Sequence, residues 1–389
     1  MMTISNWSDL PNDLLGRVLQ HLTIMNDLVR FGAVCVNWQT HFTDNHRHRA
    51  LPRKLPRQVP VLMVHNRNTH KQCFYRLSSS SSLSSTDAGE NIEFHDFPVP
   101  VPHDKYFTAS TYGWIAIAET PGFKYRLLNP FLSVNNNVAL PPLRTIDDQY
   151  IRANDMEYYV SKLALSGNPT WESDYAVMAM YGRFSELAFC KPGDDAWTTI
   201  DQKNYSFNDV VFYRDEFYAV DHIGIVVAVD IRCCRPKVRL VAPSPPEDRG
   251  YKMYLVESLG ELLQVRRVLR FLPTVGETIG FKVYELLEES TEDYEYWVEM
   301  DTLHGQALFL GDNSSVSISS LDFPECKPNC IYFTDDYRSY CNYSRQLGPQ
   351  DVGVFNVEKG RLEEYHPITK FKGMKPQPIW VEPTLEGCN

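Results

Sequence analysis

The sequence lacks the features that mark membrane and secreted proteins. It contains no run of 18 apolar residues, so we expect no membrane-spanning helix. Its first residues do not combine a basic stretch with an apolar one, so we expect no secretory signal peptide. The cysteines do not come in an even number, with nine among 389 residues, and without a signal peptide we expect free thiols in an intracellular protein of the nucleus, the cytoplasm or both.

Positive charge is also in short supply. The chain has 38 Lys and Arg against 49 Asp and Glu, which gives a net charge of −11. The first 60 residues hold seven basic and four acidic residues, whereas the remainder holds 31 and 45. An acidic main domain argues against nucleic acid as a partner. The change of sign along the chain indicates two units with different tasks.

Motifs for catalysis or metal binding are missing as well. There is no Gly-x-Ser-x-Gly turn and no glycine-rich phosphate loop. Cys326, Cys330 and Cys341 lie close together in the sequence, but a structural zinc site needs four ligands, and no close Cys or His pair completes this set. We therefore expect no catalytic residue, no metal and no cofactor.

The first 50 residues have the pattern of three short helices. "LPNDLLGRVLQHL" begins with Pro11, which suits the first turn of a helix, and continues with apolar residues at helical spacing. A second helix is expected to carry Leu28, Phe31, Val34 and Cys35, and a third Trp38 and Phe42. Helices this short cannot bury so much apolar surface among themselves, so part of it should contact a partner. Alternatively, the unit is a cap that packs on the main domain.

This segment resembles an F-box. The residues that match the family pattern are Leu10, Pro11, Asp13, Leu14, Leu15, Asp27, Leu28, Arg30, Val34, Cys35 and Trp38, with Gln39 as a departure where Arg often follows. The resemblance implies docking on the Skp adaptor of a cullin-RING ubiquitin ligase and, through it, on the cullin. The expected adaptor-binding residues are Leu10, Pro11, Leu14, Leu28, Val34 and Trp38. Sequence alone does not separate them from the core of the helical unit.

A basic, proline-rich stretch follows the helices. In "HRHRALPRKLPRQVP", residues 46–60, the prolines disfavour helix and favour extended chain. The stretch is either a solvated linker or a nuclear-import signal. We place the helical unit at residues 5–50, the linker at 51–59 and the main domain at 60–389.

The main domain consists of repeated short strands. Residues 209–242 divide into four strands, 210–213, 217–220, 223–229 and 238–241, separated by polar turns. Second strands of similar units begin near positions 73, 113, 175, 217, 262 and 331, a mean step of about 52 residues, close to the spacing of kelch-type blades. The spare segment "PIWVEP", residues 378–383, would complete the first blade and close the ring. We predict an all-β propeller of six blades, with a less regular pair of β-sandwiches as the alternative.

The main domain also resembles a plant family. "GWIAI", "LLNPF", "ALPPL", "NCIYFTDD" and "DVGVFNVEKG" are similar to the domain of unknown function that follows the F-box in many plant proteins. That family includes proteins described as kelch-like receptors and as regulators of kinases. The resemblance implies a plant F-box receptor and does not identify its target.

Residues 285–299, "ELLEESTEDYEYWVE", are the most biased loop of the main domain, with seven acidic residues and no basic one. They are either a solvated loop or a docking patch for a basic target, for which the candidate residues are Glu288, Glu289, Glu292 and Asp293. We predict a non-catalytic substrate receptor of a Skp–cullin–F-box ubiquitin ligase whose propeller binds a target protein. The alternatives are a kinase-regulating scaffold that does not lead to degradation, and a propeller enzyme such as a hydrolase or sugar oxidase.

Overall fold

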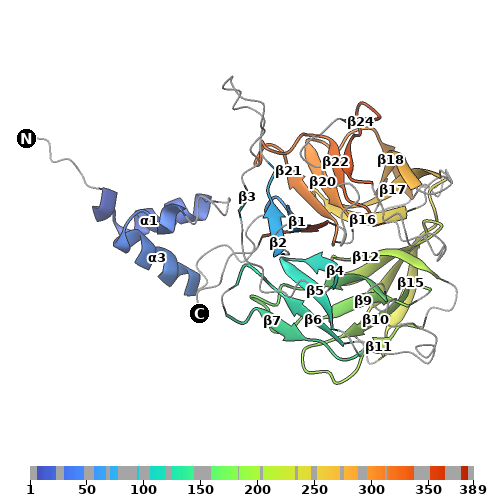
Figure 1. Ribbon diagram of the computed structural model, residues 1–389, viewed down its shortest axis with the longest axis horizontal. Coiled ribbons are helices and arrows are strands. Elements are labelled where there is room, and N and C mark those ends of the chain that lie inside the picture. Colours follow the sequence, from blue (N-terminus) through green and yellow to red (C-terminus); the bar gives the residue numbers. More distant parts are fainter. Residues whose placement is uncertain are drawn as a thin grey trace, which may run out of the picture.

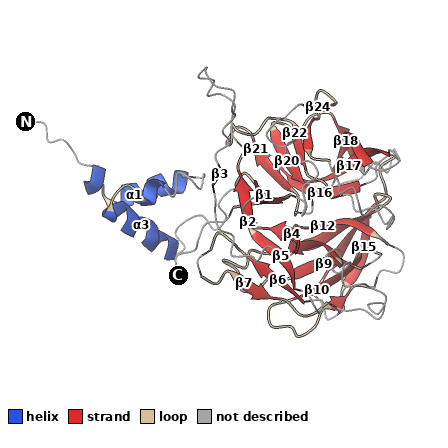
Figure 2. Cartoon of the chain, in the orientation of Figure 1, coloured by secondary structure: helices blue, strands red, loops and turns tan. Residues whose placement is uncertain are grey.

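The computed structural model of the chain has a small helical unit that stands beside a ring of β-sheets (Figures 1 and 2). It describes residues 7–22, 30–47, 57–66, 71–77, 94–95, 106–119, 124–132, 134–143, 159–182, 184–201, 205–232, 235–246, 252–271, 276–287, 296–311, 313–336, 351–363 and 378–383. The predicted fold class, a short all-α unit followed by a six-bladed all-β propeller, is confirmed.

The helical unit contains η1 (Trp7–Asp9), α1 (Asn12–His21) and α3 (Val36–Arg47). Residues 30–32 are also helical, but the second helix does not reach Val34 and Cys35 as predicted. The amides of Ala33 and Val34 instead bond the carbonyls three residues earlier, at 3.1 and 3.3 Å, a tight turn that ends a helix.

Six sheets arranged around a central axis make up the ring. Four are simple antiparallel blades in which the first strand in sequence is innermost and the following three lie progressively outward. These blades consist of β4 (Tyr106–Thr111), β5 (Trp114–Glu119), β6 (Lys124–Leu128) and β7 (Asn137–Ala139); β8 (Val160–Leu165), β9 (Val177–Tyr181), β10 (Glu186–Cys190) and β11 (Thr198–Thr199); β12 (Phe207–Tyr213), β13 (Glu216–Asp221), β14 (Val226–Asp230) and β15 (Lys237–Ala242); and β16 (Lys252–Ser258), β17 (Glu261–Phe271), β18 (Gly276–Leu286) and β19 (Trp297–Met300).

The first blade is built from both ends of the propeller, as predicted. It has the order β25 (Ile379–Val381), β1 (Val61–Asn66), β2 (Lys71–Tyr75) and β3 (Phe94–His95). The C-terminal strand is therefore the innermost strand of the first blade. This pairing closes the ring and covers the edge that β1 would otherwise leave open.

The sixth blade departs from the repeat. It has five strands in the order β21 (Val316–Ser319), β20 (Gln306–Leu310), β22 (Cys330–Phe333), β23 (Gly353–Asn356) and β24 (Arg361–Glu363). β20 turns back into β21, which takes the innermost place, and β22 then pairs with β20 in parallel. The sequence-based repeat did not include this parallel pair.

The core is divided into layers between blades. Successive side chains of a strand point to opposite faces of a sheet, so each blade supplies both neighbouring layers. On β9, for example, Val177 and Ala179 pack toward the second blade, whereas Met178 and Met180 pack toward the fourth. A buried apolar cluster of this kind lies at each of the six junctions between adjacent blades.

Candidate functional site

The inward face of α1 forms the small core of the helical unit. Leu15 and Leu19 are 0% and 1% exposed and pack with buried Phe31. The rings of Phe31 and Trp38 lie 4.5 Å apart, and the indole N–H of Trp38 donates to the carbonyl of Trp7 at 3.1 Å. Trp38 therefore holds η1 and α3 together and is largely part of the core.

The outward face of α1 carries a second apolar row. Leu14 and Val18 are 42% and 39% exposed, although each directly precedes a fully buried leucine. Residues four apart lie on the same face of a helix, so Leu14 and Val18 adjoin each other and are rotated about 100° from the Leu15–Leu19 row. This helix thus has one apolar face filled by its own unit and one facing solvent.

The residues predicted to bind the adaptor fall into three groups. Pro11, Leu14 and Val34 are exposed, while Leu10 and Trp38 are partly buried against the helical core. Leu28 lies outside the described residues. The exposed apolar residues Trp7, Val18 and Val36 were not among the predicted set, although the helical spacing of Val18 is a signal that could have included it.

The propeller axis is crossed by buried polar groups from several blades. Asp209 of β12, at 0% exposure, forms an ion pair with Lys162 of β8 and accepts the amide of Leu255 in β16 at 2.9 Å. The segment before β21 fills the remaining space, where the amide of Ser314 donates to the carbonyl of Ser110 at 2.7 Å. These contacts connect β12 to the inner strands of both neighbouring blades, and the sixth blade to the second.

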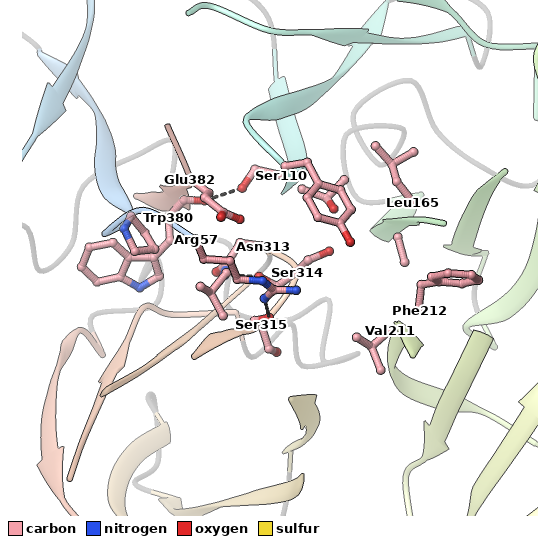
Figure 3. Close-up of a pocket in the computed structure, with 15 residues that line it drawn as sticks. Arg57, Ser110, Leu165, Val211, Phe212, Asn313, Ser314, Ser315, Trp380 and Glu382 are labelled. Atoms are coloured by element: carbon pink, nitrogen blue, oxygen red, sulfur yellow. Dashed lines mark hydrogen bonds between the residues drawn. The ribbon is translucent and has the colours of Figure 1, made fainter. Parts of the chain in front are cut away.

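Arg57 lies in a small pocket whose lining residues come from several blades (Figure 3). Arg57 donates to the carbonyl of Ser315 at 3.4 Å, and its guanidinium lies 3.9 Å from the carboxylate of Glu257. Burial lowers the pKa of Arg57, but the carboxylate of Glu382 and other acidic groups outweigh it, so the pKa is raised. The cavity beside Arg57 measures about 20 Å³, room for about one water molecule.

A second buried charge cluster joins the fifth and sixth blades. The side chain of Arg267 in β17 is 0% exposed and donates to the carboxylates of Asp336 and Asp351, both at 3.0 Å. Tyr254 donates to the same oxygen of Asp336 at 2.9 Å. Burial raises the pKa of the neighbouring Asp335 to about 7, with Arg267 lowering it and the two other carboxylates raising it. The cluster connects two blades through paired charges and does not line the axial cavity.

The other candidate residues are separated from these clusters or lie outside the description. The predicted target-binding residues Glu288, Glu289, Glu292 and Asp293 fall outside the described residues, as does Cys341. Cys326 and Cys330 are buried in the apolar layer between the sixth and first blades, where burial raises the pKa of each thiol, to about 12 and about 11 respectively. Within the described ranges, no group of three His, Cys, Asp or Glu has the geometry to hold a metal ion.

Among the residues that the structure describes, no helix combines the length and the apolar character needed to cross a bilayer.

A closed six-bladed propeller preceded by a helical unit with an unfilled apolar face defines a two-part protein with separate surfaces. The chain belongs to the KIB1-4 beta-propeller family, whose model matches residues 65–356, and an F-box domain model matches residues 7–50. Similar proteins from Arabidopsis thaliana include F-box protein SKIP23, 25% identical over 97% of this chain and 95% of that protein, and putative F-box protein At5g55150, 26% identical over 98% of each. Among solved structures, the Swd1 beta-propeller domain of Myceliophteria thermophila is 9% identical, with a TM-score of 0.35, over 79% of this chain and 85% of that one.

Proposed function

We propose that this protein is the substrate-recognition subunit of a Skp–cullin–F-box ubiquitin ligase. The helical unit docks on the Skp adaptor, which connects it to the cullin, and the propeller binds the target protein. The observation that carries the proposal is the solvent-facing row of Leu14 and Val18 on a helix whose other face is already filled. A monomer gains nothing from exposing such a row, whereas a docked adaptor would bury it.

The receptor acts by proximity and performs no covalent step. Holding a target next to the ubiquitin-charged enzyme raises the effective concentration of its lysines. A non-catalytic role is supported by the small size of the axial cavity that the described residues line, because about 20 Å³ is far less than the clefts that hold enzyme substrates. The axial charges Lys162 and Asp209 are also paired with each other and not directed at an open site.

The test replaces the outward row without touching the core. A Leu14→Ser, Val18→Ser variant is expected to lose co-purification with a Skp adaptor and to keep the melting temperature of the parent. Leu14 and Val18 are better positions to substitute than Leu10. Because Leu10 packs on the helical core, its replacement could abolish adaptor binding by unfolding the unit and not by removing a docking contact.

Two matched variants control this experiment. Asp13→Asn alters an exposed residue of the same helix away from both apolar rows and should bind the adaptor as the parent does. Leu15→Ala empties the core, at a cost of about 2–5 kcal/mol, and should abolish binding by unfolding the unit. Normal adaptor binding by the Leu14, Val18 variant would rule out this face as the docking surface.

A further inference from the structure

A pocket opens between the fifth and sixth blades, away from the axis. Its volume is about 210 Å³, more than the roughly 150 Å³ cavity that holds a benzene molecule in an engineered protein core. The residues that line it are Ser258, Leu259, Glu261, Leu263, Glu285, Met300, Leu303 and His304. A pocket of this size has room for one long side chain of a bound protein.

The walls of the pocket are apolar and belong to the layer between the two blades. Leu263 and Leu303 are buried members of that layer, and the flexible Met300 packs against it. At the rim, Leu259 is 65% exposed in the turn between β16 and β17, where its φ is +55°. His304 also lines the pocket, in a second turn, with φ +51°. These walls suit a hydrocarbon chain.

Glu285 adds an acidic side chain to the lining of the pocket. On β18, Phe281 and Val283 face the layer between the fifth and sixth blades, whereas Tyr284 faces the opposite layer. The alternation of the strand therefore directs Glu285 to the pocket side, opposite Leu263 in the ladder. Glu285 is half-buried, and within the described part of the chain it has no hydrogen bond or ion pair from its side chain.

The second acidic group of the pocket is engaged elsewhere. The carboxylate of Glu261 lies 3.5 Å from the guanidinium of Arg214 on the fourth blade, and both side chains are more than a third exposed. An exposed pair of this kind contributes about 0–1 kcal/mol. Glu261 thus adds negative potential to the pocket lining, while Glu285 has no side-chain partner among the described residues.

We propose that this pocket binds a lysine or arginine side chain of the target protein, an inference that rests on the receptor function proposed above. The methylene groups of the basic side chain lie along Leu263, Met300 and Leu303, and its cationic head pairs with Glu285. Long basic side chains bury their stems on apolar surface in this way while the charge meets a polar group. The net charge of −11 favours the approach of a basic partner.

The experiment follows the methyl resonance of Met300 in the full-length protein labelled at methionine methyl groups. The probes are N-acetyl-lysine methylamide and N-acetyl-arginine methylamide, with N-acetyl-norleucine methylamide as the uncharged analogue. We expect the two cationic probes to give saturable shifts of the Met300 methyl resonance. The norleucine probe should bind at least about tenfold more weakly, which corresponds to a difference of about 1.4 kcal/mol in binding free energy. The Glu285→Gln substitution should weaken the binding of the two cationic probes by a similar factor.

Glu277→Gln is the matched control, because Glu277 lies on the same strand, is exposed and pairs with Arg270. This variant should bind the probes as the parent does. Equal binding of norleucine and lysine probes, or unchanged binding after Glu285→Gln, would overturn the proposal. Co-purification with the Skp adaptor, measured on the same samples, reports separately on the receptor function. If the parent protein does not co-purify with the adaptor, that function is refuted, whether or not the probes bind the pocket.

Discussion

Trp380 pairs with Leu62 in the antiparallel register that joins the last described strand to the first. The indole is 1% exposed and lies edge-on to the ring of Phe309 in the sixth blade, with 5.0 Å between ring centroids. A single residue near the C-terminus therefore contacts both sides of the junction where the ring closes.

Removing residues 378–389 should open the propeller. The deletion strips the inner strand from the first blade and exposes the edge of β1, so we expect aggregation or a clearly lower melting temperature in calorimetry. Trp380→Ala alone should cost about 3–5 kcal/mol. Deleting residues 384–389 keeps β25 and serves as the control. A chain that lacks β25 and melts like the parent would show that closure does not stabilise the ring.

The sequence predicted the blades best where strands alternate or are uniformly apolar. β13 and β14 match their predicted segments within a few residues, because their buried runs stand out from polar turns. The inner strands β4 and β8 were not assigned to their blades. They carry polar groups such as Ser110 and Lys162, whose partners Ser314 and Asp209 lie in other blades, a relation between residues far apart in the sequence that no local pattern encodes.

The helical surface shows a different limit of sequence reasoning. Leu14 and Leu15 are the same residue type in adjacent positions, yet one is 42% exposed and the other fully buried. Both satisfy the helical spacing of an apolar face, so periodicity placed them together. Only the packing of Phe31 and Trp38 against one side separates the core row from the solvent-facing row.

Arg267→Met should destabilise the propeller by about 3–5 kcal/mol. The substitution keeps much of the side-chain volume but removes the guanidinium from the buried carboxylate of Asp336, which keeps only Lys252 at 3.9 Å, and from the partly buried carboxylate of Asp351. Urea unfolding measures the loss. Arg270→Met, on the same strand, removes an exposed ion pair with Glu277 and should cost no more than about 1 kcal/mol. Equal midpoints for the two variants would contradict a structural role for the buried cluster.

Gly224→Ala should disturb the junction between the fourth and fifth blades. Gly224 has φ +97°, and an added Cβ would lie 2.5 Å from the guanidinium of Arg266. We expect the free energy of unfolding to fall by more than the roughly 1–2 kcal/mol that a left-handed backbone costs an ordinary residue. Gly193→Ala is the matched control, since Gly193 has φ +89° and an added Cβ would have no atom within 4 Å. The difference between their urea midpoints measures the collision, and no difference would mean that Arg266 moves aside freely.

The carboxyl group of Asp335 should make stability fall as the pH rises from about 4 to 7. It is 4% exposed, and burial raises its pKa from 3.8 in the unfolded chain to about 7 in the fold. Between these values the folded state holds a proton that the unfolded state has released, so each step up in pH favours unfolding. The facing groups are Arg267, which lowers the pKa, and Asp336 and Asp351, which raise it.

The Asp335→Asn variant isolates this group from the other titrating residues. Asparagine resembles the protonated acid. We therefore expect the variant and the parent to have equal melting temperatures near pH 4, and the melting temperature of the variant to rise steadily above that of the parent toward pH 8. Asp230→Asn is the control: hydrogen bonds from Arg232 lower the pKa of Asp230 from 3.8 to about 2, so both folded and unfolded states are ionised above about pH 5 and the difference in melting temperature from the parent should stay constant from there to pH 8. A constant difference for Asp335→Asn as well would mean that Asp335 is already ionised in the fold at pH 5, with Arg267 outweighing its burial.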